Sequence, residues 1–328
     1  MTPAGEILAA EIRAGGPVSF HRFMEVALYD PEHGYYRSPR DPFGKHGDFF
    51  TAEQFQPVFG ILMAAYIRQL YLHMGSPKDF TIVELGPGRC EMAAAFSEWR
   101  YVPVDLDGRL PTSVTGVIFS NEFFDALPVH AAVFQDGGFR EQLVDFRNGK
   151  FLWSMGGPVS PEIGEYLRCY YPPAEEGCWY EANLHALHWM EQISSTLANG
   201  YLLTIDYGFT QPEAARFPSG TLMSYFRHVA REDVLDDPGA RDITAHVNFT
   251  ALEAKGSSVG LKKKSYEPLS QTLLQAGEPD QFAEVLAGPG PESLRRRMQL
   301  KTLLFGMGET FRVLLQEKEG FGKSDRKA

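Results

Sequence analysis

The fold is decided by the stretch TIVELGPG, residues Thr81–Gly88. Its first half is a run of β-branched and apolar residues, which is typical of a buried strand in a parallel sheet. Gly86 and Gly88 follow, and glycines let the backbone turn tightly and approach a ligand closely. In a doubly wound sheet, ligands lie beyond the carboxyl ends of the strands. The stretch therefore predicts a nucleotide-binding turn, and the alternative is an ordinary tight turn after a core strand.

Strands and helices alternate on both sides of this stretch. We expect strands over residues 80–85, 101–104, 116–120, 201–207 and 311–317, helices over 57–74, 91–98, 184–197 and 294–305, and a hairpin over 139–153. Asn148-Gly149 favours the two-residue mirror-image turn of such a hairpin. Asn199-Gly200 is expected to end the helix over 184–197. The alternation predicts an α/β fold with a doubly wound sheet.

The residue three positions after Gly88 argues against a dinucleotide. A dinucleotide fold has a third glycine at that point, where a pyrophosphate meets the start of a helix. This chain has Glu91 there. A carboxylate at a helix start repels a pyrophosphate but tolerates a cofactor without phosphates, such as a sulfonium nucleoside. Glu84 and the backbone at Gly86 are then expected near the cationic amino-acid end of the cofactor.

Longer motifs resemble a known family. Val83–Gly88, together with Asn121–Pro128 (NEFFDALP), closely resembles the MidA-like family of class I methyltransferases. Further matching motifs are found over nearly the whole chain, at Gly34–Tyr36, Gly47–Thr51, Ile205–Gly208, Gly220–Leu222, Asp237–Gly239, Asp242–Val247 and Met307–Phe311. The resemblance implies a seven-stranded, Rossmann-like methyltransferase sheet with S-adenosylmethionine as cofactor. Mitochondrial members are similar to arginine methyltransferases that assist respiratory complex I assembly, which implies a protein substrate and makes a complex I subunit one candidate.

A division of the chain follows from the pattern and the resemblance. We expect an N-terminal helical cap and lid over residues 1–75, a cofactor-binding core over 76–210, an inserted helical and loop subdomain for substrate or partner over 211–300, a closing strand within 301–319 and a flexible tail over 320–328.

Candidate cofactor contacts follow the expected strands. They are Glu84, Gly86, Pro87, Gly88, Asp105 and Asn121, with Thr51 from the preceding loop. Only 32 residues separate Gly88 from Asn121, where the family usually has a strand ending in an acidic residue and then a helix. Asp105, 19 positions after Gly86, has the spacing of a ribose-binding acid. Alternatively, residues 101–111 correspond to the strand after the missing helix, and Asp105 is a plain turn residue.

Candidate catalytic residues follow the third strand. Two carboxylates there, Glu122 and Asp125, could hold a guanidinium in bidentate fashion, orient its nitrogen and accept the proton lost on methyl transfer. Arginine methyltransferases in general use such a carboxylate pair. The alternative is that Glu122 caps or pairs locally while its aromatic neighbours fill the core.

Two further segments supply candidates. The loop Gly47–Thr51 is expected to lie over the cofactor, where Asp48 and Thr51 could contact cofactor or substrate, although the same residues could simply cap the next helix. His246 could shuttle a proton at physiological pH, or serve as a structural hydrogen-bonding group.

Composition excludes several classes of protein. A net charge of −11 argues against nucleic acid as the main partner. Three irregularly spaced cysteines suit neither a disulfide framework nor a zinc site, so no metal is expected. No apolar run is long enough to span a membrane, and the N-terminus lacks the pattern of a targeting peptide, so we expect a cytoplasmic protein without membrane insertion. Besides an arginine methyltransferase, the sequence leaves open an assembly factor that binds the cofactor without transfer, and a small-molecule methyltransferase.

Overall fold

The structure, a computed structural model, describes residues 1–38, 52–226 and 229–320. The chain forms two compact units, and each is assembled from three separate stretches of sequence. The first unit takes residues 1–50, 124–187 and 209–251, and the second takes residues 51–123, 188–208 and 252–328. The predicted doubly wound sheet lies in the second unit.

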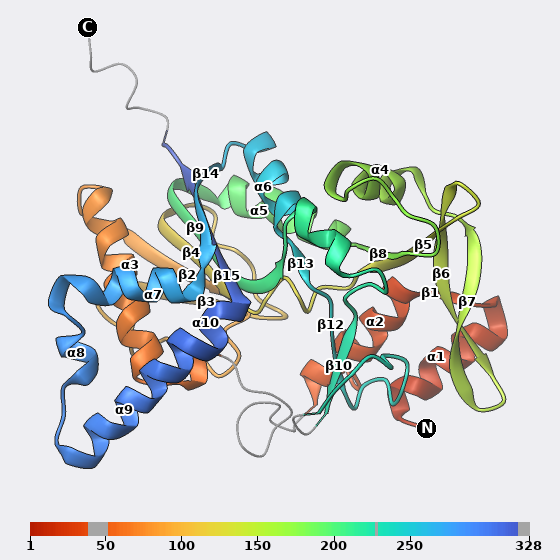
Figure 1. Cartoon of the computed structure of the whole chain (residues 1–328), viewed down its shortest axis with the longest axis horizontal. Coiled ribbons are helices and arrows are strands. Elements are labelled where there is room, and N and C mark those ends of the chain that lie inside the picture. The colour runs from red at the N-terminus through yellow and green to blue at the C-terminus, as the bar shows by residue number, and fades with distance from the viewer. Residues whose placement is uncertain (39–51, 227–228, 321–328) are drawn as a thin grey trace, which may run out of the picture. The chain divides into compact units, whose positions relative to one another are not determined.

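The core of the second unit is a mostly parallel sheet (Figure 1). The strands along its main path are β2 (Phe80–Leu85), β3 (Arg100–Val104), β4 (Val114–Asn121), β9 (Leu197–Phe209), β14 (Lys262–Pro268) and β15 (Phe311–Lys318). Their order across the sheet is β3-β2-β4-β9-β15-β14. The first four run parallel, whereas β15 runs antiparallel to β9 and to β14. All residues of β2 are buried, as expected for a strand covered on both faces.

Helices cover both faces of this sheet. On one face, α3 (Val58–His73) and α7 (Leu269–Gly277) join a large apolar cluster with side chains of the sheet such as Leu315. On the other face, α6 (Phe249–Ser258) approaches β15 so closely that a Cβ on Gly256 would lie 2.1 Å from Nε2 of Gln316, the next residue along the strand. The doubly wound arrangement is therefore confirmed.

The remaining elements of the second unit are short or peripheral. They are η2 (Ala52–Gln54), α5 (Leu184–Thr196, mostly in this unit), η4 (Glu278–Asp280), α8 (Ala283–Leu286), α9 (Gly290–Thr302), the π-helical segment η5 (Leu303–Met307) and α10 (Gly308–Thr310).

Two predictions for this unit are wrong. The predicted helix over 91–98 is instead a series of turns. Cys90 has a left-handed φ of 55°, and the amides of Cys90 and Ala93 bond three residues back, to Pro87 and Cys90, so a regular helix does not start. Asn199-Gly200 does not end α5 but lies within β9. Gly200 has φ 134°, and a Cβ there would lie 1.9 Å from the carbonyl oxygen of Gly116, so this glycine permits the close pairing of β9 with β4.

The first unit is built around antiparallel strands. One sheet contains β1 (Val18–Ser19), β5 (His130–Gln135), β6 (Gly138–Arg147), β7 (Lys150–Pro158) and β8 (Trp179–Ala182), and a second contains β10 (Met223–Phe226), β11 (Val229–Arg231) and β12 (Asp242–Thr244). The other elements are α1 (Pro3–Gly15), α2 (Phe20–Tyr29), η1 (Tyr35–Arg37), α4 (Pro161–Tyr170), η3 (Gln211–Arg216) and β13 (Val247–Asn248). The predicted hairpin is confirmed as β6–β7, because Asn148 and Gly149 both have positive φ, at 51° and 78°.

Among the residues described, no helix is both long enough and apolar enough to cross a bilayer.

Candidate active site

Polar residues gather at the carboxyl ends of β2 and β4. The two strands pair in parallel with Leu85 opposite Ser120, so the residues that follow them leave the sheet side by side. Gly86 turns with φ 64°, and a Cβ on it would lie 3.0 Å from the ring of Phe123. Gly88, with φ 50°, continues the turn. The glycines therefore allow the β2 turn to pack directly on the segment after β4.

Glu84 is fully buried at the end of β2. Tyr101 on β3 donates its hydroxyl to Oε2 of Glu84 at 2.5 Å. Burial raises the pKa of Glu84 to about 7 despite this hydrogen bond. Glu53, in η2, is also buried, and its pKa lies well above the usual range because of burial and then because of the neighbouring Glu84. At neutral pH this pair of carboxyl groups therefore retains a proton.

Glu122 is held in an unusual backbone conformation directly after β4. Its φ is 52°, which is uncommon for a residue other than glycine, and its amide donates to the carbonyl of Ile205 at 3.0 Å. Oε1 of Glu122 accepts hydrogen bonds from Nδ2 of Asn121 at 3.2 Å and from the amide of Ala52 at 3.4 Å. The carboxylate is thus fixed at the edge of the sheet where ligands bind.

Asp105 lies at the same edge, one residue beyond β3. Val104 pairs with Leu85 and accepts a hydrogen bond from the amide of Gly86 at 3.0 Å. The Asp105 side chain is exposed, and its Oδ1 accepts from the amide of Leu106 at 2.8 Å. Asp105 therefore shapes a turn next to the glycine loop, and its contact with a ribose stays a prediction.

The other predicted site residues fall elsewhere. Asp125 and His246 belong to the first unit, whereas Glu122 belongs to the second. Asp125 is buried, and its carbonyl accepts from the amide of Ala245 at 3.0 Å. Burial lowers the pKa of His246 to about 4, so its imidazole is neutral at physiological pH. Asp48 and Thr51 lie outside the described residues.

Sequence reasoning missed Glu53 and Tyr101. Tyr101 could have been found from the parallel register, since it pairs with Ile82 and so lies on the same face of the sheet as Glu84. No comparable signal pointed to Glu53, because the segment around it read only as the start of a helix.

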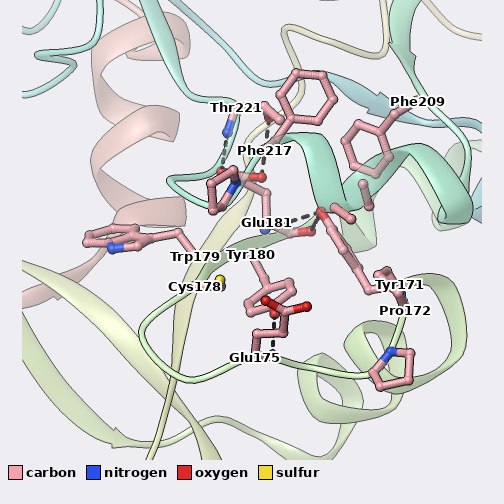
Figure 2. Close-up of a pocket in the computed structure, with 14 residues that line it drawn as sticks. Tyr171, Pro172, Glu175, Cys178, Trp179, Tyr180, Glu181, Phe209, Phe217 and Thr221 are labelled. Atoms are coloured by element: carbon pink, nitrogen blue, oxygen red, sulfur yellow. Dashed lines mark hydrogen bonds between the residues drawn. The ribbon is translucent and has the colours of Figure 1, made fainter.

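A pocket in the first unit contains a further buried acid, Glu181 (Figure 2). Its carboxylate accepts from the amide of Thr221 at 2.8 Å and from the hydroxyl of Thr221 at 3.2 Å. Tyr171 donates its hydroxyl to the Glu181 carbonyl at 2.9 Å. A Cβ on Gly220 would lie 2.3 Å from Oε1 of Glu181, so the loop is pressed against the carboxylate. These bonds identify Glu181 as an anchor for that loop.

Comparison with known proteins assigns the chain to a family. A model of S-adenosyl-L-methionine-dependent methyltransferases matches residues 96–267, more than half of the chain. The chain belongs to this family. The methyltransferase is 26% identical to the protein arginine methyltransferase NDUFAF7 homolog, mitochondrial, of Drosophila melanogaster over 303 residues, covering 74% of this chain and 67% of that protein. It is 25% identical to protein arginine methyltransferase NDUFAF7, mitochondrial, of Homo sapiens over an alignment 392 residues long, which covers 93% of this chain and 84% of that protein.

A solved structure agrees with the family. The methyltransferase resembles a COG1565 superfamily member from Burkholderia thailandensis, crystallised with S-adenosyl-homocysteine, with a TM-score of 0.85 and 29% identity over 96% of this chain and 91% of that one. The predicted family and fold are therefore confirmed, and S-adenosylmethionine is the cofactor. The residues at the end of β2 fit it, because Gly86 and Gly88 turn the backbone with positive φ and the buried Oε1 of Glu84 accepts no hydrogen bond from an amide, hydroxyl or cationic group of the described residues.

Proposed function

We propose that this methyltransferase modifies an arginine guanidinium of a protein partner. The observation that carries the proposal is the Glu122 carboxylate, which two hydrogen bonds fix beside the glycine turn. A fixed carboxylate suits a cationic planar acceptor, because a guanidinium can donate two parallel hydrogen bonds to it. The names of the relatives, which are protein arginine methyltransferases, support the same acceptor.

Residues at the ends of three strands would hold the cofactor. Gly86, Pro87 and Gly88 would lie against it, Glu84 and Asn121 would face its amino-acid end, and Asp105 would accept hydrogen bonds from the ribose. When bound, S-adenosylmethionine supplies a methyl group attached to a positively charged sulfur.

Glu122 has two tasks in this mechanism. It holds the guanidinium so that one nitrogen lies in line with the methyl carbon, and it accepts the proton that this nitrogen loses. The new bond joins nitrogen to carbon, the carbon–sulfur bond breaks, and its electron pair stays on sulfur. The charge of the sulfonium is thereby neutralised, so the site needs orientation and exclusion of water more than a strong nucleophile.

The other predicted residues have supporting roles in the proposal. Asp125 would be the second carboxylate of the guanidinium clamp, and the neutral imidazole of His246 would relay the proton to solvent. Asp48 and Thr51 would contact cofactor or substrate from the loop within the N-terminal cap, residues 1–75. Residues 211–300 would contact the partner protein.

Glu122→Gln tests the clamp because it keeps the side-chain size and removes the charge. With radiolabelled cofactor and host lysate, we expect the wild type to label a protein on arginine and the variant to lose at least about a hundredfold in rate, as is typical for loss of a general base. Glu319→Gln is the control, because Glu319 follows β15 and Lys318 pairs with Gly200, near the opposite ends of the parallel strands. Unimpaired arginine labelling by Glu122→Gln contradicts the clamp.

The same assay separates the alternatives. Label only in the low-mass fraction indicates a small-molecule methyltransferase, and cofactor binding without any transfer indicates an assembly factor. Mass spectrometry of the labelled band tests whether the partner is a respiratory complex I subunit. Fractionation tests the proposed cytoplasmic location, since the relatives are named mitochondrial.

A further inference from the structure

Glu53 and Glu84 form a pair of buried carboxyl groups at the cofactor end of the sheet. Their exposed fractions are 6% and 0%. Each has an Oε1 atom that is shielded from solvent and accepts no hydrogen bond from an amide, hydroxyl or cationic group of the described residues. The two side chains come from different elements, η2 and β2, and face one another closely enough for a proton on one to be shared with the other.

The groups around the pair are mostly acidic. Glu122, after β4, and Glu91, in the turns after β2, both face Glu53 and add negative charge. The hydroxyl of Tyr101 on β3 donates to Oε2 of Glu84. Of the described cations near this cluster, Arg89 lies 3.5 Å from Glu91, and its side chain is 41% exposed. The pair thus has one neutral donor and no buried cation among the described residues.

Two adjacent carboxylates cannot both stay charged in such surroundings at low cost. Burial disfavours each charge, and a like charge next to it disfavours the second ionisation further. A shared proton removes one of the two charges, and the pair then titrates as a unit. A cation that entered the cluster would compensate the charge in place of that proton.

We infer that Glu53 is part of the cofactor site, and that the Glu53–Glu84 pair releases its shared proton when the ammonium group of S-adenosylmethionine binds. The inference rests on the cofactor contacts of Glu84 in the proposed function. The proton passes to solvent, the positive charge of the cofactor takes its place, and no covalent bond changes. The pair therefore carries one negative charge before binding and two after it.

Cofactor affinity then depends on pH in a definite direction. Where the pair is protonated in the free protein, each cofactor that binds releases about one proton, and the dissociation constant falls about tenfold for each unit of rising pH. Where the pair is already ionised, binding releases no proton and the affinity levels off. The pKa of Glu84, raised to about 7, places the change between these regimes near neutrality.

Proton release can be measured directly. We propose calorimetric titration of the cofactor-free protein with S-adenosylmethionine at about pH 6, in two buffers of different ionisation enthalpy, to count the protons released on binding. We expect close to one proton for the wild type and for Glu319→Gln, which leaves the cluster intact. Glu53→Gln removes one of the two acids, and its amide can donate to Glu84 and stabilise the charged form, so the variant should release clearly less than the wild type and should show a flatter dependence of affinity on pH.

Tyr101→Phe provides a second test in the opposite direction. It removes the hydroxyl that stabilises the charged form of Glu84, so proton release should persist to higher pH than in the wild type. If Glu53→Gln does not fold, as judged by circular dichroism, this shift decides alone. Binding by the wild type without proton release between about pH 5.5 and 8, or equal release by Glu53→Gln, overturns the inference. Proton release without arginine labelling instead refutes only the proposed acceptor.

Discussion

The cofactor-free protein should become less stable as the pH rises through neutrality, and Glu84→Gln should remove the part of this change that comes from Glu84. The pKa of Glu84 is about 7 in the folded protein against an ordinary value of 4.5. At this site the folded state therefore binds more protons than the unfolded state between these values, so the stability that Glu84 contributes is greatest below about pH 4.5 and is lost as the pH rises through 7. At about 1.4 kcal/mol for each pKa unit, the loss amounts to roughly 3 kcal/mol.

Urea titrations at about pH 5 and pH 8 measure this difference in the free energy of unfolding. Hydrogen exchange of peptides that cover β2 locates it, since it reports the opening of that strand rather than of the whole chain. Gln at position 84 carries no charge, so we expect the difference to fall by roughly 3 kcal/mol in the variant, with the remainder coming from the buried Glu53, while Glu319→Gln should behave as the wild type. If Glu84→Gln keeps the full wild-type dependence on pH, the buried charge is not its source.

Three other substitutions test separate parts of the structure. Gly200→Ala should destabilise the protein by about 3 kcal/mol or more, because its Cβ would collide with the backbone of β4. Gly137→Ala is the control: φ there is 75° but the space around it is open, so the substitution should cost about 1 kcal/mol. Equal losses in the free energy of unfolding, measured by chemical denaturation, would contradict the close approach of β9 and β4. Asp105→Ala should weaken S-adenosylmethionine binding at least about tenfold if this acid contacts the ribose, so an unchanged dissociation constant sinks that assignment. Thr221→Val should lower the midpoint of thermal unfolding, because it removes about 1–2 kcal/mol of hydrogen bonding to the buried Glu181. Thr221→Ser should retain the hydrogen bond and the midpoint. A valine variant as stable as the wild type would show that this hydrogen bond is dispensable.

The sheet could be predicted because its signals are local. The buried run of β2, the glycine turn after it and the Asn148-Gly149 hairpin each depend on a few adjacent residues. The turns over 91–98 could not be predicted, because the apolar spacing there suits a helix and the left-handed Cys90 leaves no mark in the sequence. The prediction that Gly200 ends a helix was wrong for a related reason, since glycine ends helices as readily as it permits close contact between strands.

The candidate site was predictable in part for a different reason. Glu84 is the penultimate residue of β2 and Glu122 follows β4 directly, so the rule that ligands bind at the carboxyl ends of strands is enough to select them. The raised pKa of Glu53 comes from burial and from Glu84, which is distant in sequence, and a buried pair of this kind depends on tertiary packing. The assembly of each compact unit from three stretches of chain likewise depends on long-range contacts, and no local sequence pattern predicts it.

The position of β15 has a consequence for synthesis on the ribosome. This strand, residues Phe311–Lys318, lies between β9 and β14, although both precede it in the chain. Until it emerges, β9 presents an unpaired edge and β14 has no neighbour in the sheet, and such edges are sites of aggregation. We therefore expect the nascent chain to need protection by chaperones until translation has passed β15, and stop codons shortly before that strand should yield insoluble product rather than a smaller folded enzyme.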